Sequence, residues 1–86
     1  MTDVVPGRVA RFRQNEALRG FAEGLPGPFG FRCECAELWC GELVPVDAAD
    51  VYAIRANPRR LVMALGHETD RERIVLTYDR YIIVEL

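Results

Sequence analysis

The three cysteines of this chain lie within eight positions, in the pattern Cys33-x-Cys35-x4-Cys40. The single histidine, His67, follows in a Gly-His-Glu segment. Three thiolates and one imidazole make a complete ligand set for a tetrahedral divalent cation, and zinc is the usual occupant of such sites. The pattern therefore predicts a zinc site with Cys33, Cys35, Cys40 and His67 as its four ligands.

A structural metal site is typical of a chain of this size. With 86 residues the protein forms one domain, and so short a chain buries too little surface for a strong core. Small folds commonly add a structural metal. A metal that joins the cysteines to His67 also closes a loop of roughly thirty residues, which removes entropy from the unfolded chain. We expect a flexible lead-in over residues 1–7, followed by a zinc-binding domain over residues 8–86.

Other interpretations of the cysteines stay open. Buried thiols can pack as small apolar groups without a metal. Two of the cysteines can oxidise and release the metal, which would make the cluster a thiol switch. Cys35 or Cys40 can instead pair with His67 as nucleophile and base, with Glu68 as an orienting carboxylate. A catalytic zinc is disfavoured, because four protein ligands leave no open coordination position.

Composition restricts the classes of partner. The formal net charge is −2, and a mildly acidic protein lacks the electrostatic footprint of a nucleic-acid binder. No segment approaches the ~20 apolar residues that cross a bilayer. Residues 1–6 lack the basic and apolar regions of a signal peptide. We therefore expect a cytoplasmic protein, in which clustered thiols stay reduced and bind metal rather than form disulfides.

Helical patterns occupy two segments. A first helix is predicted over residues 8–23, ended by Gly24 and Pro26. Its apolar stripe consists of Ala10, Ala17, Leu18 and Phe21, and its polar face, which we expect to be solvated, consists of Gln14, Asn15, Glu16 and Arg19. A second helix is predicted to begin at Asp47, with Asp50 completing an acidic capping box. It should end before Pro58.

The remaining segments have the patterns of strands. Alternation, β-branched residues and flanking turns predict strands over residues 29–34, 42–46, 61–65, 73–78 and 81–86. Asp79-Arg80 is short enough to close a tight hairpin between the last two. Both faces of that hairpin are apolar, which indicates a sheet covered on both sides or an association surface. The predicted fold class is α+β, with an N-terminal helix and antiparallel hairpins.

Two further features have a functional and a plainer interpretation. Trp39 lies between two predicted ligands, where it either contacts a partner or shields the metal from water. Arg59-Arg60 can receive an anion, but a solvated pair is the interpretation we adopt.

Several segments in order resemble a group of small, mostly uncharacterised actinobacterial proteins. They are residues 12–16, 31–35 with Cys40, 52–60, 65–68 and 81–85. Leu65 stands where that group would have a proline before the glycine. The resemblance implies a metal-binding domain and no assigned enzymatic activity.

From these patterns we expect a small zinc-stabilised, non-catalytic protein-interaction module. Its partner would be another protein or a second copy of the chain, with no membrane and no nucleic acid involved. A zinc- or thiol-based redox-responsive regulator is the alternative, and a Cys/His-dependent enzyme is a further one.

Overall fold

The computed structural model of this protein describes residues 7–22 and 24–86. These residues form two helices and two antiparallel sheets, which confirms the predicted α+β class with an N-terminal helix. The elements in order are α1 (Arg8–Ala22), β1 (Phe29–Arg32), β2 (Leu43–Val46), α2 (Ala48–Arg55), β3 (Arg60–Ala64), β4 (Arg73–Thr77) and β5 (Tyr81–Glu85). Apart from Gly7, the lead-in predicted over residues 1–7 lies outside the described residues.

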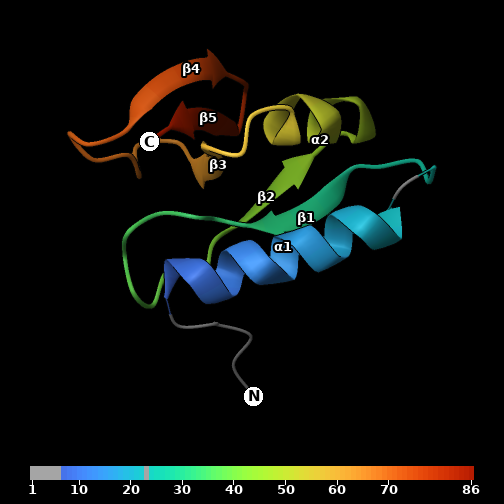
Figure 1. The fold of residues 1–86 in the computed structure, drawn as a ribbon, viewed down its shortest axis with the longest axis horizontal. Helices are drawn as coiled ribbons and strands as arrows, with labels where there is room; N and C mark the ends of the chain where they lie inside the picture. Colours follow the sequence, from blue (N-terminus) through green and yellow to red (C-terminus); the bar gives the residue numbers. More distant parts are fainter. Residues whose placement is uncertain (1–6, 23) are drawn as a thin grey trace.

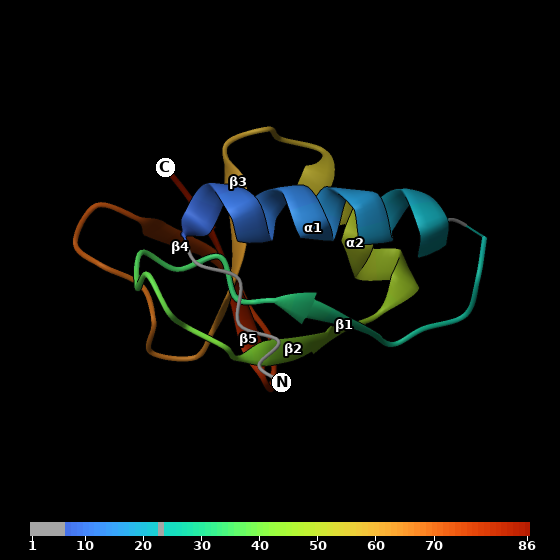
Figure 2. The same ribbon diagram turned by 90° about the horizontal axis from the view of Figure 1, so that it is seen from below.

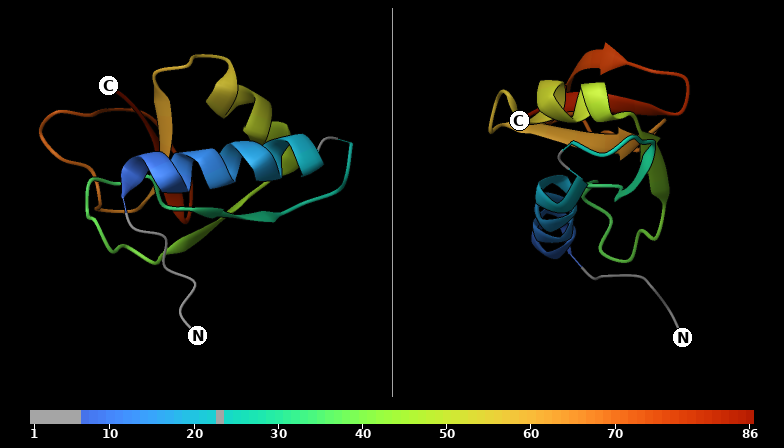
Figure 3. Two further views of the ribbon diagram at one scale, coloured as in Figure 1. Left: turned by 60° about the horizontal axis from the view of Figure 1, so that its bottom comes forward. Right: turned by 90° about the vertical axis from the view of Figure 1, so that its right-hand side faces the viewer.

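The β1–β2 hairpin lies in the middle of the molecule (Figure 1). Helix α1 runs along one side of it, and the sheet of β3, β5 and β4 lies on the other side with α2 next to it (Figures 1 and 3). Phe31 of β1 pairs with Val44 of β2, and both side chains are buried. The hairpin is therefore the element through which α1 and the larger sheet are joined.

The centre of the core is strand β5, which pairs with both β3 and β4. Residues 81–84 of β5 and residues 61–64 of β3 are all buried, as expected for strands covered on both faces. At the sheet edge, β4 leaves Ile74 and Leu76 partly exposed. Of the two alternatives predicted for the last hairpin, covering on both faces therefore holds for β5 but not for β4, and the association surface stays a prediction.

Helix α1 buries a different face from the one predicted. Arg11, Asn15 and Ala22 are buried at helical spacing, whereas Phe21 is 77% exposed. The solvated polar face was wrong for Asn15, and in the predicted apolar stripe Leu18 packs against the hydrophobic core, as Phe12 does, whereas Ala17 and Phe21 are exposed. The physical reason is that the side of α1 that carries Arg11 and Asn15 packs on backbone oxygens, a sulfur and a carboxylate, which require hydrogen-bond donors.

Helix α2 begins after Asp47, as predicted, but without a capping box. Asp47 makes no side-chain capping hydrogen bond. Asp50 instead accepts a hydrogen bond of 3.0 Å from the hydroxyl of Tyr81, which draws its carboxylate away from the helix terminus. The predicted tight turn is present, because Tyr78 N donates to Tyr81 O at 2.8 Å and the two tyrosine rings stack.

Candidate metal centre

The cysteines lie on the continuation of the β1–β2 hairpin. Cys33 directly follows β1, and its N–H donates to Glu42 O at 3.0 Å, which extends the hairpin by one further pair. The chain then turns, and Cys40 N donates to Glu37 O at 3.3 Å as the chain returns toward β2. We call residues 33–40 the knuckle. Its turn brings Cys40 back to the first two cysteines.

His67 reaches the knuckle from a separate turn between β3 and β4. Its N–H donates to Ala64 O at 3.2 Å, and Gly66 provides the positive φ of 81° that this turn requires. The turn and the knuckle lie at the same end of the molecule, next to the start of α1 (Figure 2). Three of the predicted ligands therefore come from the segment between β1 and β2, and the fourth comes from the turn between β3 and β4.

The four side chains converge. One ligand atom from each of Cys33, Cys35, Cys40 and His67 lies within 4.8 Å of all the others. The Nδ1 atom of His67 lies 3.5 Å from Cys33 Sγ and 3.7 Å from Cys40 Sγ. Tetrahedral zinc, with bonds of about 2.3 Å to sulfur and 2.0–2.1 Å to nitrogen, would separate such atoms by about 3.5–3.6 Å. The cluster is thus positioned to bind a metal ion through Nδ1.

Two donors point at the sulfurs from outside the cluster. Ala64 N donates to Cys33 Sγ at 3.2 Å, and the guanidinium of Arg11 donates to Cys35 Sγ at 3.7 Å. Hydrogen bonds to a thiolate favour its charged form, and donors of this kind orient metal ligands. All three cysteines are free thiols and buried, so the cluster is also shielded from bulk water.

The three thiols differ in acidity. Burial, together with the neighbouring cysteine charges, raises the pKa of Cys33 to about 12, and burial also raises the pKa of Cys40. Burial opposes ionisation of Cys35 as well, but hydrogen bonds from His67, the Glu37 backbone and Arg11 outweigh it and lower its pKa to about 6. Without a cation this cluster holds one thiolate readily, and binding a metal would release the remaining protons.

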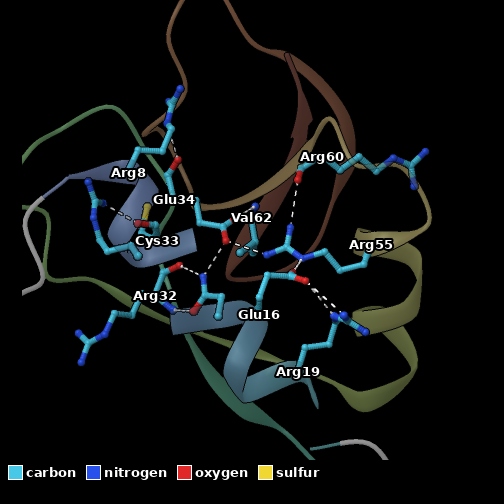
Figure 4. Close-up of polar contacts among 11 residues, drawn as sticks. Arg8, Glu16, Arg19, Arg32, Cys33, Glu34, Arg55, Arg60 and Val62 are labelled. Atoms are coloured by element: carbon cyan, nitrogen blue, oxygen red, sulfur yellow. Dashed lines mark hydrogen bonds and ion pairs between the residues drawn. The ribbon is translucent and has the colours of Figure 1, made fainter. Parts of the chain in front are cut away.

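Glu34 lies between two of the cysteines and points the other way. It is fully buried, and its carboxylate accepts hydrogen bonds from Asn15 Nδ2 at 2.9 Å, Arg55 Nη2 at 2.8 Å and Val62 N at 2.9 Å. Figure 4 shows Glu34 between Arg55 and Val62. Alternation along an extended chain explains the arrangement, because successive side chains point to opposite faces. One carboxylate thus ties α1, α2 and β3 to the knuckle.

Arg55 extends this polar cluster toward α1. Besides Glu34 it forms an ion pair with Glu16 and donates to the backbone oxygen of Arg60 at 3.1 Å (Figure 4). Its guanidinium carbon also lies 4.5 Å from the ring centre of Phe12. The Arg55 side chain is 10% exposed, and with this many partners its charge is compensated within the fold. Sequence analysis missed Arg11, Glu34 and Arg55. The signal for Glu34 was the strict alternation of Cys33, Glu34 and Cys35.

The structure also shows the surroundings of Trp39 and of the Arg59-Arg60 pair. Trp39 is 60% exposed, so most of its surface is open to solvent. Arg60 is not a solvated side chain, because it pairs with Glu85 at 3.1 Å and donates to Ala53 O at 2.8 Å. Arg59 is exposed.

The fold and this cluster define a small α+β domain with three cysteines and one histidine positioned around a common point. No protein-family model matches the chain, and searches of curated proteins and of solved structures also found no match. The resemblance to the actinobacterial proteins therefore stays a prediction. In the part of the chain that the structure describes, neither helix is long and apolar enough to span a membrane.

Proposed function

We propose that this protein is a zinc-stabilised, non-catalytic interaction module, and that Cys33, Cys35, Cys40 and His67 bind the zinc. The observation that carries the proposal is the convergence of all four ligand atoms within 4.8 Å. Thiolate and imidazole ligands in a tetrahedral arrangement favour zinc among the common divalent ions. Four protein ligands complete its coordination, which is typical of a structural site.

A structural role also follows from where the ligands come from. The knuckle extends the β1–β2 hairpin, whereas His67 follows β3 of the other sheet. A shared ion would therefore join the two sheets at one end of the molecule, and in small domains this kind of link can supply most of the folding free energy. The His67 Nδ1 atom faces two sulfurs at similar distances, which suits a shared cation better than a single nucleophile–base pair.

Exposed apolar side chains support an interaction role. Leu38 and Trp39 are 52% and 60% exposed on the knuckle, and Ile74 and Leu76 are exposed on the edge strand β4. The buried centre of a protein interface is more apolar than the rest of the surface, and aromatic residues are enriched there. A protein partner or a second copy of the chain would cover them.

Metal analysis tests the proposal directly. Protein purified without added metal should contain one zinc ion per chain, and Cys40→Ser should lose it. Glu42→Gln, an exposed neighbour, is the matched control and should keep its zinc. A protein that contains no zinc, takes up none and keeps its fold in excess chelator would contradict the proposal.

The same preparation distinguishes the alternatives. A structural site should retain zinc in mild peroxide. Release of zinc together with a change in oligomeric state would identify a redox-responsive regulator instead. Rapid alkylation of one cysteine in the zinc-loaded protein would favour a Cys/His-dependent enzyme.

A further inference from the structure

Arg11 is fully buried beside the candidate metal centre, and all of its donors are used. Its Nε donates to Gly7 O at 3.2 Å, and Nη1 donates to Cys33 O at 2.6 Å and Cys35 Sγ at 3.7 Å. Its Nη2 donates to Cys35 O at 3.2 Å and Glu37 O at 2.5 Å. The five N–H groups of a guanidinium thus bind four backbone oxygens and one sulfur. Four of these five acceptors belong to the knuckle.

Among residues 7–22 and 24–86, no carboxylate forms an ion pair with Arg11. Among the described residues the ion pairs involve Arg8, Arg19, Arg55, Arg60 and Arg73, but not Arg11. A buried charge is costly unless an opposite charge or a dense set of hydrogen bonds compensates it. Carbonyl oxygens supply only partial negative charge. In the described part of the chain, the group bound to Arg11 that can carry a full negative charge is the sulfur of Cys35.

The charge of a loaded centre supplies what Arg11 lacks. A divalent ion bound by three thiolates and one neutral imidazole has a formal charge of minus one. The guanidinium carries plus one, so the two together are neutral. A neutral unit can be buried at much lower cost than either part.

We propose that Arg11 is the counter-ion and the positioning residue of the metal centre. Its charge balances a divalent ion held by three thiolates, and its fork fixes the backbone that carries Cys33 and Cys35. This inference rests on the proposed function. It also gives helix α1 a specific role, because α1 delivers the charge that the metal ligands require.

Two neighbouring residues sharpen the assignment. Arg8 donates to Glu34 O at 3.0 Å, but it is partly exposed and already pairs with Glu72 at 3.4 Å. Asn15 is as deeply buried as Arg11 and binds the hairpin through the backbone of Arg32 at 2.7 and 2.8 Å. It contacts no sulfur, so it anchors α1 without affecting the ligands. Asn15 therefore provides the matched control.

The test compares Arg11→Met, Arg11→Lys and Asn15→Leu with the unaltered protein. Zinc affinity is measured by competition with a chromophoric chelator, and cobalt serves as the spectroscopic probe. Arg11→Met should weaken zinc binding by about 10- to 100-fold, the usual effect of losing a group that supports metal ligands. It should also move the sulfur-to-cobalt charge-transfer absorption to longer wavelength, because a thiolate without a nearby cation loses an electron more easily.

The other two variants separate charge from packing. Arg11→Lys keeps the positive charge but loses the planar set of five donors. Its absorption maximum should therefore lie close to that of the unaltered protein, while its zinc affinity should lie between those of Arg11→Met and the unaltered protein. Asn15→Leu should lower stability yet leave the absorption where it is in the unaltered protein. If Arg11→Met fails to fold, Arg11→Gln replaces it under the same two expectations.

Clear results would overturn the inference. An unshifted absorption with zinc affinity within about threefold of the unaltered protein would show that Arg11 is not the counter-ion. An equal shift of the cobalt absorption in Asn15→Leu would show that any weakening of the packing of α1 shifts the absorption, whether or not the charge of Arg11 is lost. If the unaltered protein binds neither zinc nor cobalt, the proposed function itself fails, and that outcome is seen before any variant is compared.

Discussion

The two faces of the knuckle solve the problem of buried charge in different ways. On one face, Cys33 and Cys35 point at His67 and Arg11, and under the proposed function a cation from solution completes the cluster. On the other face, Glu34 finds all of its partners within the chain. Adjacent residues of one extended segment thus form a candidate metal site and a polar cluster that is complete without a ligand. The comparison assigns the expected metal dependence to one face, and it predicts unequal effects of perturbing the two.

Removal of the metal should have the largest effect. Structural zinc contributes about 10 kcal/mol or more to folding in small domains, which is comparable with the whole stability of such a protein. Excess chelator at neutral pH should therefore unfold the protein at room temperature, as measured by circular dichroism, and added zinc should refold it. If the protein in chelator kept the near-ultraviolet spectrum of the zinc-loaded protein, its fold would not depend on metal, and the proposed difference between the two faces would be wrong.

Loss of the Glu34 carboxylate should have the next largest effect. Removing one partner of a buried ion pair costs about 3–5 kcal/mol, because the other charge is left uncompensated. Glu34→Gln should lower the free energy of unfolding of the zinc-loaded protein by about that amount in urea titrations. Glu37→Gln is the control, since that side chain is exposed on the same knuckle. Equal stability of the two variants would show that the carboxylate cluster contributes little.

A smaller effect is expected for the hydrogen bond between Tyr81 and Asp50, which links β5 to α2 away from both faces. Tyr81→Phe should lower the free energy of unfolding by about 1 kcal/mol near neutral pH, the usual value of one hydrogen bond. Urea unfolding of the zinc-loaded protein would measure this. A loss as large as that of Glu34→Gln would contradict the ranking.

The same tyrosine predicts a dependence on pH. Burial and the Asp50 carboxylate raise the pKa of Tyr81 above its usual value of 10.0, because both disfavour the phenolate. The stabilisation that follows is complete below the unfolded pKa and is lost as the pH rises from there toward the folded pKa. The unfolding free energy should therefore fall above about pH 10, and less steeply in Tyr81→Phe. Parallel slopes for the two proteins would exclude Tyr81 as the cause.

The smallest effect is expected on the exposed face of α1. Phe21→Ser should change the free energy of unfolding by no more than about 0.5 kcal/mol, because that side chain is 77% exposed. Asn15→Leu, on the buried face of the same helix, should cost considerably more. Thermal unfolding of the two zinc-loaded variants makes the comparison. A larger loss of stability in Phe21→Ser than in Asn15→Leu would show that α1 packs through the apolar face predicted from the sequence.

The sequence by itself determined which segments are helices and strands, whereas several predicted ends differ from those observed, such as that of the strand that ends at Arg32. Turn residues and local periodicity act over a few positions, so the limits of α2 before Pro58 and the tight turn at Asp79-Arg80 could be predicted. It also predicted the four candidate ligands, because few residue types bind zinc and this chain has only four thiol or imidazole side chains.

The tertiary structure decided which polar groups are buried. Arg11, Asn15 and Glu34 look like surface residues in sequence, since charged and amide side chains usually face water. They are buried because segments distant in the chain bring them backbone oxygens, thiol groups and an arginine of opposite charge. No local pattern encodes those partners. A polar side chain is buried when its complement lies elsewhere in the fold, and only the packing of α1, α2 and β3 around the knuckle supplies that complement.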